Sequence, residues 1–167
     1  MTNENNLLDP RLHFVVATAI IVKCDDLEKK RYFLIIKRAP HEKAFPNRWT
    51  VPGGKLVLHE YEHLSKTAGY PQWYGVVDWV LRKEVREETG LDIEKPNYLC
   101  NLVFVRPDGY PVVTLSYWAH YKNGEVVLGK DFTDFSWVTL EEARKYDLIE
   151  GIYNELAMVE NILSGKK

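Results

Sequence analysis

The most informative segment of this 167-residue chain reads Lys83-Glu84-Val85-Arg86-Glu87-Glu88-Thr89-Gly90-Leu91. On an α-helix its three glutamates share one face, with neighbouring Cβ atoms about 5–6 Å apart. Like charges so close repel one another, and a hard divalent cation such as Mg²⁺ or Mn²⁺ takes oxygen ligands of this kind. The segment therefore predicts a helix that ends at Gly90 and holds a metal ion. The alternative is a solvated face whose charges pair with Arg82, Lys83 and Arg86.

A second polar segment lies upstream and reads Trp49-Thr50-Val51-Pro52-Gly53-Gly54-Lys55. Pro-Gly-Gly ends a predicted short strand, and glycine adopts backbone conformations that are closed to other residues. A Gly-Gly turn also lets main-chain groups approach an ion or a phosphate closely. Glu60 follows this turn and adds a further carboxylate ahead of the acidic helix.

Together the two segments resemble the Nudix box of the Nudix hydrolases. That pattern is Gly, five residues, Glu, seven residues, then Arg-Glu-aliphatic-x-Glu-Glu-x-Gly-aliphatic. The residues that match it here are Gly54, Glu60, Glu84, Val85, Glu87, Glu88, Gly90 and Leu91. The resemblance implies an α/β fold, the Nudix-type α/β/α sandwich with a mixed, largely antiparallel-paired sheet, over nearly the whole chain.

The chain departs from that pattern at two places. Lys83 stands where the family has arginine, so the positive charge is kept but the planar, two-pronged donor is lost. Between Glu60 and Lys83 the chain also carries about fifteen extra residues, roughly 61–75. This insertion makes the role of Glu60 less secure than that of the helix glutamates, whose spacing does not depend on the loop.

The resemblance implies hydrolysis of a pyrophosphate bond in a nucleoside diphosphate linked to another moiety, such as ADP-ribose or a nucleotide sugar, or in a non-standard nucleoside triphosphate. The implied cofactor is Mg²⁺, with Mn²⁺ as the alternative. The expected metal ligands are Gly54, Glu84, Glu87 and Glu88, and the expected catalytic carboxylates are Glu60, Glu84 and Glu87. A Nudix-like module that binds a nucleotide or a partner without hydrolysis is the second hypothesis.

Other polar and aromatic residues are candidates for the same site. Lys37 and Arg38 end a predicted strand and are candidate phosphate ligands, or simply an exposed strand end. Asp131 and Asp134 precede another strand, where an extra acidic ligand or base is expected from the resemblance. Trp73, Tyr74 and Tyr110 are candidate base-stacking residues, with packing or a dimer contact as the alternative. Pro107 resembles a downstream proline associated with ADP-ribose hydrolysing members, but it also suits a turn.

Composition agrees with one compact domain over residues 1–167, with residues 1–10 as a flexible tail. The formal charge of −2, without a basic block, gives no support to a large nucleic-acid surface, so the expected partner is a small nucleotide. No apolar run reaches the roughly 20 residues that span a bilayer. The start of the chain has no signal-peptide core, and Cys24 and Cys100 lack metal-site spacing, so we expect a cytoplasmic protein with reduced, buried thiols. A homodimer is left open.

The pattern of apolar residues predicts strands at 13–23, 32–37, 49–51, 98–105, 112–121 and 135–138. Residues 106–111 read as a hairpin turn. Thr139 is expected to cap a short helix, with Glu142 as its capping-box partner. A final amphipathic helix is expected over 149–163.

Overall fold

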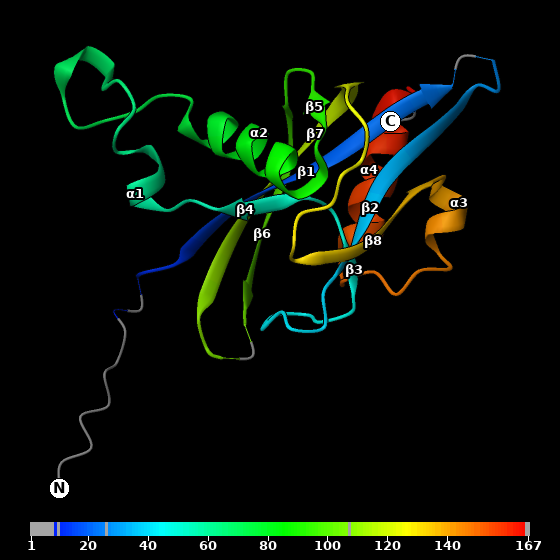
Figure 1. Cartoon of the computed structure of the whole chain (residues 1–167), viewed down its shortest axis with the longest axis horizontal. Coiled ribbons are helices and arrows are strands. Elements are labelled where there is room, and N and C mark those ends of the chain that lie inside the picture. The colour runs from blue at the N-terminus through cyan, green and yellow to red at the C-terminus, as the bar shows by residue number, and fades with distance from the viewer. Residues whose placement is uncertain (1–8, 10, 26, 107, 166–167) are drawn as a thin grey trace, which may run out of the picture.

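The structure is a computed structural model that describes residues 9, 11–25, 27–106 and 108–165. The tail expected at residues 1–10 lies outside the described residues except for Asp9, and Pro107 lies outside them too. One mixed sheet runs through the molecule, with the order β3-β2-β1-β7-β5 along its main path (Figure 1). In addition, β4 pairs with β1, β6 with β7, and β8 with β2.

The strands are β1 (Phe14–Asp25), β2 (Lys30–Arg38), β3 (Trp49–Thr50), β4 (Gly53–Lys55), β5 (Asp92–Ile93), β6 (Asn97–Val105), β7 (Pro111–Asn123) and β8 (Phe132–Val138). The helices are α1 (Leu58–Tyr61), the 3₁₀ turn η1 (Thr67–Gly69), α2 (Val76–Thr89), α3 (Leu140–Ala143) and α4 (Ile152–Leu163). Strands β1 and β7 pair in parallel, and the other strand pairs are antiparallel. The predicted mixed, largely antiparallel sheet is thereby confirmed.

Helix α2 covers one face of the sheet and α4 the other, as Figure 1 shows. The alternation of side chains along β1 explains this division. Ala17, Ala19 and Ile21 pack toward α2, in the same core cluster as Leu81 and Val85. Ile20 and Val22 point the other way and join a second cluster, which includes Leu156 and Val159 of α4. The predicted α/β/α sandwich is therefore confirmed.

The largest differences from the predicted element boundaries, three residues each, are at the starts of α4 and β8. Helix α4 begins at Ile152 and not at residue 149, because Gly151 has a φ of 92° that interrupts the helical backbone. Strand β8 begins at Phe132 and not at residue 135, because Phe132 is buried and pairs with the end of β2. The predicted helix ends are confirmed: Gly90 has a φ of 72° after α2, and Thr139 and Glu142 form a capping box.

The insertion at 61–75 packs on itself. Trp73 donates its indole N–H to the Leu64 carbonyl over 3.1 Å, and its ring lies edge-on to Tyr61 with the centroids 5.3 Å apart. Tyr74 is 80% exposed.

Both cysteines are free. Cys24 is exposed because it lies near the open end of β1, so the expectation of a buried thiol was wrong there. Within the described residues no helix is both long and apolar enough to cross a membrane.

Candidate functional site

The Gly53-Gly54 pair brings strand β4 against helix α2. Gly53 pairs with Thr18 and Gly54 with Ala17 in the β1–β4 ladder. A side chain at Gly53 would overlap the main chain of β1, and one at Gly54 would overlap the carboxylate of Glu84. Gly53 therefore requires glycine for reasons of space, whereas at Gly54 a side chain would force the Glu84 carboxylate to move. The result is that a main-chain turn and a glutamate of α2 lie in direct contact.

Glu88 is tied to the same turn. Its Oε2 accepts a hydrogen bond from the Gly53 N–H over 2.8 Å. Burial raises the pKa of Glu88 to about 8, the Gly53 N–H acts against this rise, and the charge of Glu84 adds to it. A carboxylate in this position carries negative charge that the protein alone compensates poorly.

Lys83 lies at the centre of the acidic cluster. Its ammonium group is 3.0 Å from Glu87, 3.1 Å from Glu84 and 3.5 Å from Glu60. Burial acts to lower the pKa of Lys83, but hydrogen bonds to Glu87 and Glu84 outweigh it and hold the pKa above its ordinary value. The lysine thus joins Glu60, from beyond the turn, to the helix glutamates in spite of the insertion between them.

The donor set fits a hard divalent cation. Glu60, Glu84 and Glu87 surround the ammonium group of Lys83, and Glu88 accepts from the Gly53 N–H, so negative charge is in excess. All their ligand atoms are oxygens, which Mg²⁺ and Mn²⁺ prefer. The absence of a side chain at Gly54 lets the Glu84 carboxylate lie directly against the main chain.

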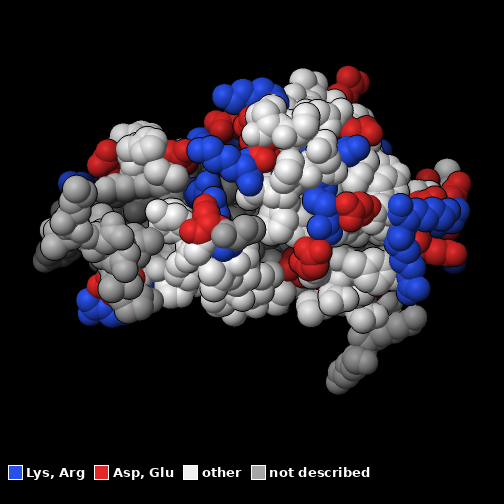
Figure 2. Space-filling model, turned by 90° about the horizontal axis from the view of Figure 1, so that it is seen from below, with Lys and Arg blue, Asp and Glu red and all other residues white. Residues whose placement is uncertain are grey.

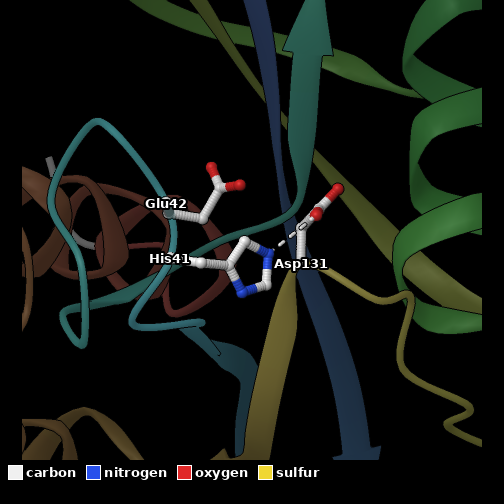
Figure 3. A group of neighbouring side chains, drawn as sticks. All are labelled: His41, Glu42 and Asp131. Carbon is white, nitrogen blue, oxygen red and sulfur yellow. Dashed lines mark hydrogen bonds and ion pairs between the residues drawn. The ribbon is translucent and has the colours of Figure 1, made fainter.

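A second polar cluster comes from two loops. His41 and Glu42 follow β2, and Asp131 precedes β8; one ligand atom of each lies within 4.8 Å of the others (Figure 3). The His41 ring is directed at Asp131, with Nε2 3.3 Å from the carboxylate oxygen. Glu42 forms an ion pair with Arg38. Sequence reasoning left His41 aside, since a histidine in a loop is more often solvated than functional.

A cavity of about 890 Å³ connects these groups. The predicted site residues that line it are Arg38, Gly54, Glu60, Glu84 and Glu88. Asp131 contacts it through His41, which is a lining residue. Tyr110 packs on the lining residue Phe14, with the ring centroids 5.3 Å apart.

Other predicted residues lie elsewhere. Glu87 is exposed and meets the cluster through Lys83. Lys37 and Asp134 are register partners on β2 and β8, outside the cavity lining. Trp73 and Tyr74 belong to the self-packed insertion and are not lining residues either.

The cavity also contains residues that the sequence reasoning did not single out. Phe14, Phe45 and Phe104 give it aromatic walls, and Glu155 of α4 lies among its lining residues. The sequence pattern of α4 does indicate that Glu155 is buried. This glutamate falls three residues after Ile152 and four before Val159, on the apolar stripe of the helix.

Charges of both signs are interspersed over the molecular face shown in Figure 2.

No family model matches the chain. It is 26% identical to the nucleoside triphosphatase NudI of Klebsiella pneumoniae subsp. pneumoniae over 137 residues, which cover 76% of this chain and 86% of that protein. It is 25% identical to the NudI of Salmonella agona over 147 residues, covering 82% and 94% of the two chains.

Solved structures share the fold. The NUDIX domain of Shewanella oneidensis NrtR, crystallised with ADP ribose, has a TM-score of 0.70 at 18% identity and covers 98% of this chain and 99% of that one. A MutT protein from Methanosarcina mazei Go1 has a TM-score of 0.68 at 18% identity and covers 96% and 100%. The motif residues assembled around Gly54 and Lys83 and the similarity to the NudI proteins support membership of this chain in the Nudix hydrolase family.

Proposed function

We propose that this protein hydrolyses a pyrophosphate bond of a nucleotide with the help of a divalent cation, Mg²⁺ or Mn²⁺. The observation that carries the proposal is the arrangement of the cavity. Glu60, Glu84 and Glu88 line one part of it, and aromatic side chains line another. A nucleotide has the matching division between charged phosphates and a flat, largely apolar base.

Each residue of the cluster has a role in this reaction. A divalent cation held here would supply neutralisation of the phosphate oxygens and a lowered pKa for a water molecule. Glu84, Glu87, Glu88 and the Gly54 carbonyl would hold it through their oxygens. Lys83 holds Glu84 and Glu60 in place, since its ammonium group contacts both.

Proton transfer falls to a carboxylate that faces the cavity. Glu60 lines it and is held only by a 3.5 Å contact with Lys83, so it is free to accept a proton from an attacking water. Glu84 and Glu87 are the other candidates for this role. Arg38 lines the cavity and donates to the Ala44 carbonyl over 2.7 Å, which keeps its charge beside the phosphate path.

The names of the relatives agree on the class of substrate. NudI is named a nucleoside triphosphatase, and the NrtR domain was crystallised with ADP ribose. Both ligand types contain a nucleotide whose phosphates are joined by an anhydride bond. The substrate we propose is accordingly a nucleoside triphosphate, or a nucleoside diphosphate linked to another moiety.

A hydrolysis panel tests this function. Purified protein is incubated with nucleoside triphosphates, ADP-ribose, nucleotide sugars and dinucleotides, with Mg²⁺, with Mn²⁺ or with EDTA, and the products are separated by chromatography. We expect cation-dependent cleavage of at least one substrate, lost in Glu84→Gln and retained in the matched control Glu94→Gln, whose exposed side chain lies outside the cavity lining. A wild-type protein that binds nucleotides but cleaves none of them with either cation would instead be a binding module.

A further inference from the structure

The cavity extends from the glutamates onto the α4 face of the sheet. Cross-strand partners on β1, β7 and β6 form its floor, and their register places them in rows that face the same way. Two of these rows consist of cavity-lining residues: Phe14, Val112 and Phe104 in one, and Val16, Thr114 and Leu102 in the other. These two rows are apolar except for Thr114, and the next row adds the lining residue Thr18.

Aromatic rings stand around this floor. Phe45, from the loop between β2 and β3, lies with its ring centroid 6.4 Å from that of Phe104. Phe14 lies tilted against Tyr110, and the guanidinium of Arg106 lies over the Phe14 ring, 5.7 Å from its centroid. Flat rings that line an apolar cavity suit a flat ring as ligand, because stacking tolerates any heterocycle.

Glu155 is the exception in these surroundings. It lies on the buried stripe of α4 and is only 4% exposed, yet it is a lining residue of the cavity. Its Oε2 is buried and has no hydrogen-bond partner. Within the part of the chain that the structure describes, the one other such side-chain atom is Nε of Arg106, which lines the same cavity. A buried polar atom without a partner is costly, and both of these residues line the cavity in which a ligand would lie.

The charge state of Glu155 follows from its neighbours. Burial raises the pKa of its carboxyl group, and the side chain of Ser116 offsets only part of the rise. Among the described residues no Lys, Arg or His is paired with it. Burial thus shifts this carboxyl group toward the neutral acid, which offers one O–H donor and one C=O acceptor side by side.

We propose that the α4 end of this cavity is a nucleobase subsite in which Glu155 selects the base, by pairing its adjacent donor and acceptor with a ring nitrogen and an exocyclic group of the heterocycle. This inference rests on the proposed function, since it takes the ligand to be a nucleotide. It assigns the phosphates to the glutamates of α2 and the base to the aromatic end. A buried carboxyl group that is paired with no cation among the described residues disfavours a phosphate there, and the flat aromatic walls of the cavity favour a base over a ribose.

Binding without catalysis tests the subsite. Dissociation constants for AMP, CMP, GMP and UMP are measured by titration calorimetry in EDTA, with ribose 5-phosphate as the base-free probe. We expect the wild type to bind its preferred monophosphate at least tenfold more tightly than the least preferred one. Glu155→Leu removes both hydrogen-bonding atoms and is expected to reduce that ratio to less than threefold. Glu155→Gln keeps a donor and an acceptor and is expected to retain selectivity.

The matched control is Glu160→Gln, the same change on the same helix at a residue that pairs with Arg31 outside the cavity lining. It is expected to bind all probes as the wild type does. Circular dichroism checks that each variant folds. If Glu155→Leu does not fold, the contact is deleted on the ligand instead: an analogue of the preferred monophosphate without its exocyclic group is expected to bind the wild type at least tenfold more weakly.

Two results would overturn the subsite: an unchanged selectivity ratio in folded Glu155→Leu, or equal affinity for the preferred monophosphate and its analogue in the wild type. Loss of selectivity in Glu155→Gln would overturn the neutral donor-acceptor pairing. Failure of the proposed hydrolysis is a separate result, because it is measured as absent cleavage by the wild type with Mg²⁺ or Mn²⁺. The binding ratios in EDTA do not depend on it.

Discussion

The carboxylate of Glu84 occupies the space beside Gly54 that any side chain at residue 54 would need. This contact joins the turn after β3 to helix α2, two parts of the chain that the insertion separates in sequence. The contact between the Gly54 main chain and the Glu84 carboxylate therefore holds the two halves of the candidate site together.

Gly54→Ala is therefore expected to displace the Glu84 carboxylate and to lower cation-dependent turnover by about 100-fold, the loss that a displacement of about 1 Å can cause. The melting temperature should fall as well. In a Glu84→Ala background the methyl group has room, so Gly54→Ala should then cost little stability. Thermal melting of the four proteins gives the coupling between the two positions; purely additive losses would contradict the contact.

Glu88→Gln is expected to weaken Mg²⁺ binding while the protein without cation stays at least as stable as the wild type. Glu88 is buried and its pKa is raised, so a negative charge at this position is unfavourable in the protein without cation. Glutamine removes that charge, and the expected cost is limited to the binding of the cation. Calorimetry with Mg²⁺ should show a loss of about 10–100-fold, as for other perturbed metal sites. An unchanged Mg²⁺ affinity would exclude Glu88 from the ligand set.

Lys83→Met removes the one ammonium group that contacts Glu60, Glu84 and Glu87. We expect the melting temperature in EDTA to fall by about 2–4 °C, the shift that ~1 kcal/mol gives in a chain of this length. Saturating Mg²⁺ should recover more stability in this variant than in the wild type, because the cation replaces the missing charge. Lys83→Arg keeps the charge and adds a two-pronged donor, so its turnover should match or exceed that of the wild type.

Trp73→Ala is expected to loosen the insertion rather than the site. Trp73 packs on Tyr61 and donates to the Leu64 carbonyl, outside the cavity lining. Limited proteolysis should cut the variant faster within residues 61–75, whereas KM for the best substrate changes little. A strong rise in KM with unchanged proteolysis would favour the earlier hypothesis that this ring stacks on the base.

Glu155 should make stability depend on pH. Its pKa is raised by burial, so its favourable contribution is complete below the ordinary glutamate pKa of about 4.3 and is lost as the pH rises through the folded-state value. Glu155→Gln has no carboxyl group to ionise and should not lose this stability as the pH rises. The variant should therefore gain in melting temperature relative to the wild type between pH 5 and pH 8 in EDTA. A difference that stays constant over this range would show that the carboxyl group does not titrate there.

The sequence was sufficient for the parts of the fold that depend on local spacing. The acidic helix, its end at Gly90 and the Thr139 capping box each follow from residues within one or two helical turns, and the structure confirms them. The family resemblance also placed Gly54 and the helix glutamates in one expected ligand set, and in the structure Gly54 lies against Glu84. No sequence rule predicted how Lys83 would reach across to Glu60, because that contact bridges the insertion.

The cavity could not be predicted in the same way. Phe14, Phe45 and Phe104 come from separate parts of the chain and meet only because β1 pairs with β7 and β7 with β6. The aromatic residues of the insertion attracted attention because they are close to the motif in sequence, but the structure turns Trp73 inward on its own loop. The position of Glu155 on the apolar stripe of α4 indicates that its carboxyl group is buried. It does not indicate that this group lies beside a cavity.

One row of the sheet links the two ends of the cavity. Gly53, Thr18 and Ser116 are successive cross-strand partners on β4, β1 and β7. Gly53 holds Glu88 at one end, and Ser116 acts on Glu155 at the other. The ends of this row are therefore separated by two strand spacings, each of about 4.8 Å. Hydrogen bonds between the strands fix this distance. Under the proposed function, it would select nucleotides by the length between the base and the scissile phosphate, because a longer or shorter ligand would not reach both ends.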